Sequence, residues 1–143
     1  MTFEDLDAWK KARATVNVVY ALTRNSSLSK DFGLCSQIQR AAVSVMSNIA
    51  EGFERHNAGE KIQAYNIARA SCGEVRSLLY VIEDNYSSAG NVTEVRKHLA
   101  DTGSLLSGLI FSTRKRLVGK AAAGITAALL VSWFGIRFLL PNL

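Results

Sequence analysis

The clearest helical pattern in the chain lies in residues 65–86, which read YNIARASCGEVRSLLYVIEDNY. Its regularly spaced positions are Tyr65, Ala68, Cys72, Val75, Leu79, Ile82 and Tyr86. Because an α-helix has 3.6 residues per turn, positions separated alternately by three and four residues share one face. The alternation continues without a break, which is typical of a helix that packs at a shallow angle against neighbouring helices.

Three further segments carry the same kind of pattern. The periodicity predicts helices over residues 3–24, 31–54 and from 92 onward, with turn-forming residues between them. No stretch alternates with period two for long enough to indicate a strand, and the only proline is Pro141. Because short turns make consecutive helices antiparallel, residues 1–115 are predicted to form an all-α, up-down-up-down four-helix bundle.

The positive charge of the chain is concentrated near its C-terminal end. The sequence has 17 Lys and Arg residues against 12 Asp and Glu residues, a net charge of +5. All acidic residues lie at or before Asp101, whereas five basic residues follow residue 113, so residues 1–113 are neutral. Non-specific nucleic-acid binding depends on phosphate neutralisation, which a neutral body supports poorly. A basic cluster beside an apolar segment instead indicates the cytoplasmic flank of a membrane helix.

An apolar segment follows this basic cluster. Residues 121–136, AAAGITAALLVSWFGI, contain no charged side chain, and their flanks lengthen the apolar run. The uncharged part is about 24 Å long as a helix, and the extended run exceeds the roughly 30 Å of a hydrocarbon layer. Residues 116–143 are therefore predicted to extend the fourth helix as a hydrophobic, membrane-spanning anchor. The membrane helix is assigned Ala121, Ile125, Leu129, Leu130, Trp133 and Phe134, and the juxtamembrane basic cluster Arg114, Lys115, Arg116 and Lys120.

The distribution of basic residues predicts the orientation of this anchor. Four basic residues precede the apolar segment and only Arg137 follows its uncharged part, so the bundle is expected in the cytoplasm, at the inner (cytoplasmic) membrane. The alternative is a cytoplasmic protein whose last helix packs against the bundle or against other subunits. An apolar helix without a polar face would then need burial on all sides, which favours the membrane.

Several short motifs resemble those of one protein family. The chain opens with Phe3-Glu4-Asp5-Leu6, continues with Phe32-Gly33-Leu34 and Asn48-Ile49-Ala50-Glu51-Gly52, and later contains Ala68-Arg69-Ala70-Ser71 followed by Glu74. Over residues 3–115 it is similar to the four-helix-bundle proteins encoded in intervening sequences of bacterial 23S rRNA genes. The resemblance implies a ring-forming homo-oligomer, typically a pentamer, without catalytic activity. A related protein is the accessory variability determinant of diversity-generating retroelements, whose ring binds a reverse transcriptase and nucleic acid.

A polar stripe runs along the second predicted helix. Its members lie three or four residues apart and therefore share one helix face: Gln37, Arg40, Ser44, Asn48 and Glu51. Serine and asparagine are mediocre helix formers, so their position within a helix favours a subunit interface or a polar network over a solvated face, which is the alternative. The same interface or polar network is assigned Arg69, Ser71 and Glu74 of the third helix, with Glu74 and Arg69 as candidate ion-pair partners of Arg40 and Glu51.

The sequence offers little that would support catalysis. Cys35 and Cys72 lie 37 residues apart inside helical patterns, and only two histidines are present, His56 and His98. No nucleophile–base pair or glycine-rich phosphate loop is recognisable. We therefore expect two reduced core thiols and a non-enzyme with no metal, cofactor or small-molecule substrate.

Together these features predict a ring-forming, pentameric bundle that is anchored in a membrane and acts as an oligomeric scaffold. Tail helices gathered around one axis could also form a pore. The alternative is a soluble oligomeric adaptor that binds RNA or a reverse transcriptase, as the resemblance to the retroelement protein implies.

Overall fold

The computed structural model describes the backbone of residues 2–24, 27–86 and 92–139, and the side chains of these residues up to 119 and at 121. This part of the chain contains four α-helices and no strand: α1 (Asp7–Thr23), α2 (Phe32–Glu54), α3 (Ala58–Asn85) and α4 (Val92–Leu139). Two short 3-10 turns, η1 (Phe3–Asp5) and η2 (Leu28–Lys30), precede α1 and α2. The prediction of an all-α chain with four helices is confirmed.

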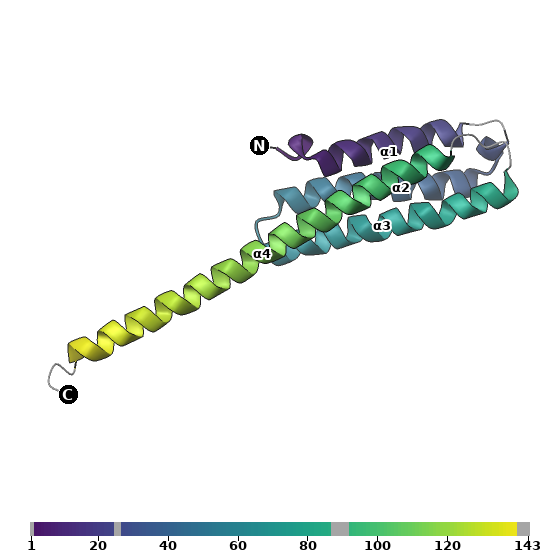
Figure 1. Cartoon of the computed structure of the whole chain (residues 1–143). Coiled ribbons are helices and arrows are strands. Elements are labelled where there is room, and N and C mark those ends of the chain that lie inside the picture. Colours follow the sequence, from purple (N-terminus) through teal and green to yellow (C-terminus); the bar gives the residue numbers. More distant parts are fainter. Residues whose placement is uncertain (1, 25–26, 87–91, 140–143) are drawn as a thin grey trace.

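The helices are arranged as a bundle (Figure 1). Each helix runs back beside the one before it, and α4 closes the bundle by packing against both α3 and α1. The core lies between the four helices. In α3, the predicted apolar face is buried from Tyr65 to Ile82, and Tyr86 is half-buried. The corresponding face of α4 is buried at Val92, Val95, Leu99, Thr102 and Leu106.

The first helix differs from the prediction at its beginning. A continuous helix was expected from Phe3, but the backbone of Leu6 is extended (ψ 125°) and α1 begins at Asp7. The preceding turn η1 is closed by the backbone N–H of Thr2, which donates to the Asp5 carboxylate at 2.8 Å. The extended residue lets the Leu6 side chain enter the core, where it is 8% exposed. Burial of a leucine outweighs the lost helical turn.

Two side chains mark where the middle helices begin. The Asn57 side chain accepts a hydrogen bond from the Gly59 backbone N–H at 2.7 Å, so α3 begins at Ala58, inside the segment expected as a turn. At the start of α2, the Asp31 carboxylate accepts hydrogen bonds from the Leu34 backbone N–H at 2.9 Å and from the Tyr86 hydroxyl at 2.8 Å. Asp31 therefore caps α2 and also ties it to the end of α3.

The Asp31 cap is expected to make stability depend on pH. Its hydrogen bonds, above all the one from the Leu34 N–H, hold the pKa of the Asp31 carboxyl below its ordinary value of 3.8. A lowered pKa stabilises the fold above about pH 4, and this contribution is lost as pH falls through the folded-state pKa. Asp31→Asn keeps a capping oxygen but cannot titrate, so we expect a smaller drop in urea midpoint between pH 7 and pH 3 than in the wild type.

Asp84→Asn provides the control for this experiment, because Asp84 is exposed and does not cap a helix. Its midpoint should follow the wild type over the same pH range. An identical pH dependence for the wild type and Asp31→Asn would contradict the assignment.

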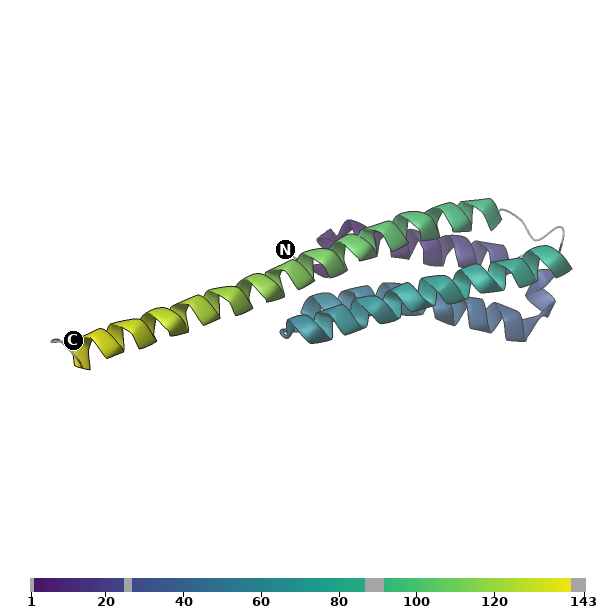
Figure 2. The ribbon, with the colours of Figure 1, turned by 60° about the horizontal axis from the view of Figure 1, so that its bottom comes forward.

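Helix α4 continues past the ends of the other helices (Figure 2). Its last buried side chain among those described is Thr113, and residues 114–119 are exposed. A search of the described residues finds no helix that is long and apolar enough to span a membrane. Of the residues assigned to the anchor and its basic flank, Ala121, Arg114, Lys115 and Arg116 are exposed. The side chains of the others lie outside the described residues: Lys120, Ile125, Leu129, Leu130, Trp133 and Phe134.

Candidate functional site

The structure brings two residues of the predicted polar stripe, Ser44 and Asn48, together with Ser71 of α3 where α2 and α3 meet. The hydroxyl oxygens of Ser44 and Ser71 lie 2.8 Å apart. The Asn48 side-chain amide donates to the Ser44 carbonyl oxygen at 2.8 Å and to the Ser44 hydroxyl at 3.2 Å. Ser71 is buried, and a buried hydroxyl without a hydrogen-bond partner would destabilise the fold. These hydrogen bonds explain why small polar residues occupy mid-helix positions here.

The charged members of the stripe behave differently from the prediction. Glu51 forms an ion pair with Arg55, the residue that follows the end of its own helix. Among the described residues, no ion pair joins Glu51 to Arg69 or Arg40 to Glu74. Arg69 lies two positions from Ser71, and residues two apart do not share a helix face. The buried Ser71 hydroxyl thus meets α2, whereas Arg69 is exposed on another side of α3.

The remaining polar residues lie on an exposed surface beside the serine pair. Gln37, Arg40 and Glu74 are exposed and form no hydrogen bond or ion pair within the described part of the chain. Two hydrophobic residues of α3 flank Glu74 at intervals of seven: Ile67 is 46% exposed and Val81 is 43% exposed. Seven residues are close to two helical turns, so these three share one face. We call this surface the assembly face, and its members are Gln37, Arg40, Ser44, Asn48, Ile67, Glu74 and Val81.

One close contact in this region was not predicted from the sequence. A Cβ atom added to Gly52 would lie 2.5 Å from Cε1 of the Tyr65 ring, which is closer than atoms can pack. The glycine of the Asn-Ile-Ala-Glu-Gly motif therefore lets the buried Tyr65 ring lie directly against α2. The sequence does contain a signal for this contact. Gly52 lies in the same buried stripe as Val45 and Ile49, and a glycine inside a helix usually has a packing reason.

The thiols and histidines do not form a reactive site in the described residues. Burial raises the pKa of the Cys72 thiol to about 11, and burial together with the Asp31 charge raises that of Cys35. Both thiols are therefore protonated at neutral pH and poorly nucleophilic. Within the described residues, no group of three or more His, Cys, Asp or Glu side chains could hold a metal ion.

Comparison with known families adds the last observation. The family model described as 23S rRNA-intervening sequence protein matches residues 4–108. This range includes α1, α2, α3 and most of the part of α4 that packs in the bundle, and it contains the Ser44–Ser71 pair and the Gly52–Tyr65 contact. Comparison with curated proteins found no match. Because the matched range exceeds half of the chain, the protein belongs to the 23S rRNA-intervening sequence protein family.

Proposed function

We propose that the protein is a non-enzymatic oligomeric scaffold, whose bundle assembles with further copies and whose C-terminal segment anchors it in the inner membrane. The observation that carries this proposal is the course of α4, which continues to Leu139 beyond Thr113, the last buried residue among the described side chains. Residues 121–136 of this extension carry no charge. An uncharged apolar helix is stable only in apolar surroundings, which lipid or other subunits can supply.

The basic cluster supports lipid over soluble packing. Arg114, Lys115 and Arg116 are exposed where α4 leaves the bundle. Basic residues next to an apolar segment are attracted to anionic headgroups, by about 1 kcal/mol each near the surface. The same asymmetry of charge supports a cytoplasmic position for the bundle.

The assembly face supports oligomerisation. It combines two exposed hydrophobic residues, Ile67 and Val81, with the unpaired side chains of Arg40 and Glu74. Exposed apolar residues with a polar, solvent-accessible rim are typical of protein interfaces. We propose that this face of one copy meets a different face of the next in a closed ring, since a ring requires a heterologous interface, and five subunits is the number implied by the family resemblance. Arg40 of one copy would then be free to pair with an acidic residue of the next.

Removal of residues 116–143 tests the anchor. The full-length chain is expected in the membrane pellet after high-salt washing, and the truncated chain in the supernatant, because the deletion removes the whole apolar run. The matched control replaces Arg114, Lys115 and Arg116 together by glutamine, which removes electrostatic adsorption but keeps the apolar segment. This variant should remain in the pellet after the salt wash.

Full-length protein in the supernatant after the salt wash, without detergent, would refute the anchor. The alternative function, a soluble adaptor for RNA or a reverse transcriptase, would then be tested by salt-dependent RNA binding. Binding that survives the deletion of residues 114–143 would favour the adaptor, since the neutral residues 1–113 would have to supply the contacts.

A further inference from the structure

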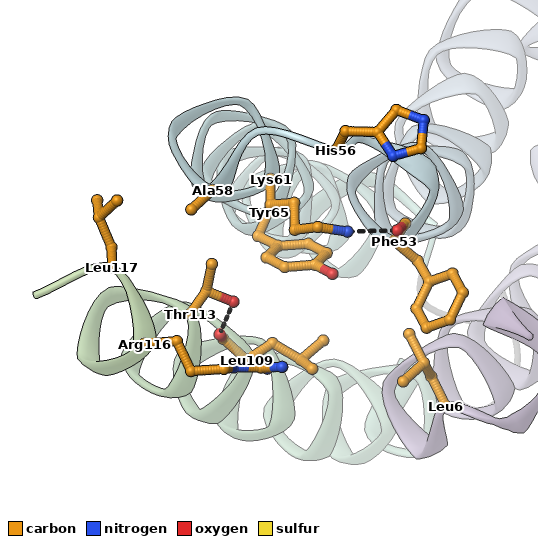
Figure 3. A pocket seen from close by; sticks show the side chains of 10 residues that line it. All are labelled: Leu6, Phe53, His56, Ala58, Lys61, Tyr65, Leu109, Thr113, Arg116 and Leu117. Carbon is orange, nitrogen blue, oxygen red and sulfur yellow. Dashed lines mark hydrogen bonds between the residues drawn. The ribbon is translucent and has the colours of Figure 1, made fainter. Parts of the chain in front are cut away.

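A pocket of about 330 Å³ lies at the end of the bundle from which α4 departs (Figure 3). Its volume lies at the lower end of the range of about 300–1,000 Å³ found for small-molecule sites. Three parts of the chain enclose it: the connection from α2 to α3, the first turns of α3, and α4 between Leu109 and Leu117. Leu6, which the extended backbone before α1 turns inward, closes one side.

The walls of this pocket are mainly hydrophobic. Leu6, Phe53, Leu109 and Leu117 contribute aliphatic or aromatic surface, and Figure 3 shows them around the same space. Leu117 follows the last buried turn of α4 among the described side chains and is 45% exposed. The pocket therefore exposes apolar surface that favours a ligand with hydrocarbon groups.

The charged groups of the pocket are cationic. Lys61 and Arg116 line it together with His56, and no acidic residue is found among its described lining residues. The Lys61 ammonium donates to the carbonyl oxygens of Gly52 and Phe53, so part of its capacity is used at the end of α2. Arg116 forms one hydrogen bond, from Nε to the Ser112 carbonyl oxygen, which leaves its terminal nitrogen atoms available.

Tyr65 supplies a further donor. The residue is only 3% exposed, yet no hydrogen bond of its hydroxyl is found in the described part of the chain. Tyr65 and Arg116 line the same pocket (Figure 3). Burial raises the pKa of the Tyr65 phenol, and the Arg116 charge opposes this rise. At neutral pH the phenol is an O–H donor, and the pocket that it lines also holds the Arg116 guanidinium; donors of these two kinds suit an oxyanion.

We propose that this pocket binds the phosphate of an anionic membrane phospholipid, with Arg116 and Tyr65 as its donors and the first methylenes of an acyl chain against Leu109 and Leu117. The inference rests on the proposed membrane anchor, because the pocket lies where α4 leaves the bundle and would face the headgroup layer. A guanidinium matches phosphate geometry with two parallel hydrogen bonds. The site would fix the bundle against the membrane surface, beyond the attachment that the apolar segment supplies.

The test measures, by native mass spectrometry, how much of each of two lipids the full-length chain retains in a neutral detergent. The probes are phosphatidylglycerol and phosphatidylcholine with identical acyl chains. We expect preferential retention of phosphatidylglycerol by the wild type and a loss of about tenfold for Arg116→Gln, since a charge-assisted hydrogen bond is removed. Arg114→Gln is the matched control: it removes the same charge two positions away, and Arg114 does not line the pocket. Its retention should equal that of the wild type.

Equal retention of phosphatidylglycerol by Arg116→Gln and Arg114→Gln would overturn the site, since the lipid preference would then depend only on the general surface charge. Tyr65→Phe removes only the hydroxyl and should weaken phosphatidylglycerol retention in the same direction; no change would remove Tyr65 from the site. Displacement of the lipid by inorganic phosphate would overturn the lipid assignment in favour of a free phosphate. Fractionation reports the anchor separately: Arg116→Gln should stay in the membrane pellet, so failure of the pocket and failure of the anchor are distinguishable.

Discussion

Replacement of Ile49 by alanine is expected to destabilise the bundle by about 2–5 kcal/mol, the largest effect of any substitution proposed for this protein. Ile49 belongs to the Asn-Ile-Ala-Glu-Gly motif and is 0% exposed between the helices. The change removes three carbon atoms from a closely packed core and leaves a cavity that the surrounding helices fill only in part. Urea unfolding of the full-length chain in detergent, followed by near-ultraviolet circular dichroism, measures the difference in free energy.

Ile67→Ala is the matched control because it makes the same chemical change on the assembly face. Ile67 is 46% exposed, so its truncation should alter the free energy of unfolding by no more than about 0.5 kcal/mol in the monomer. The same variant should weaken self-association in light scattering if the proposed interface is correct. An unchanged oligomer would exclude Ile67 from the interface. Equal destabilisation by the two variants would contradict the assignment of Ile49 to the core.

Gly52→Ala and Gly108→Ala are expected to change stability in opposite directions. Alanine is ordinarily favoured over glycine in a helix by about 1 kcal/mol. At Gly52, however, the new methyl group would collide with the Tyr65 ring, whose position is enclosed by α2 and α4. Overpacking of this kind typically costs about 1–3 kcal/mol, so it exceeds the gain in helix propensity. We expect a net loss for Gly52→Ala.

At Gly108 nothing lies within 4 Å of an added Cβ atom, and the residue is exposed in α4. Gly108→Ala should therefore stabilise the protein by about 0.5–1 kcal/mol. Thermal unfolding of both variants compares the two signs in one experiment. Stabilisation by both substitutions would show that the Tyr65 ring moves aside freely, and destabilisation by both would show that the propensity gain is not realised in this bundle.

The helices and their buried faces could be predicted from the sequence because they are encoded locally. A helix repeats every 3.6 residues, so the spacing of Ala68, Val75, Leu79 and Ile82 predicts both the element and the side that enters the core. The family could be recognised for a related reason, since its motifs are short and contiguous. The neutral bundle and the basic cluster at residues 114–116 are also properties of the sequence alone.

Contacts between helices required the tertiary structure. Periodicity grouped Ser44 and Asn48 on one face, but only the position of α2 relative to α3 paired Ser44 with Ser71. The same relative position makes Gly52 necessary beneath the Tyr65 ring.

Segments that are distant in sequence also decide three further features: the extended backbone at Leu6, the hydrogen bond from Tyr86 to Asp31 and the pocket lined by Arg116. A period of 3.6 residues specifies the direction in which a side chain points around the axis of its own helix. The atom that it meets depends on how neighbouring helices are shifted and rotated against each other, and that arrangement follows from packing the whole core at once.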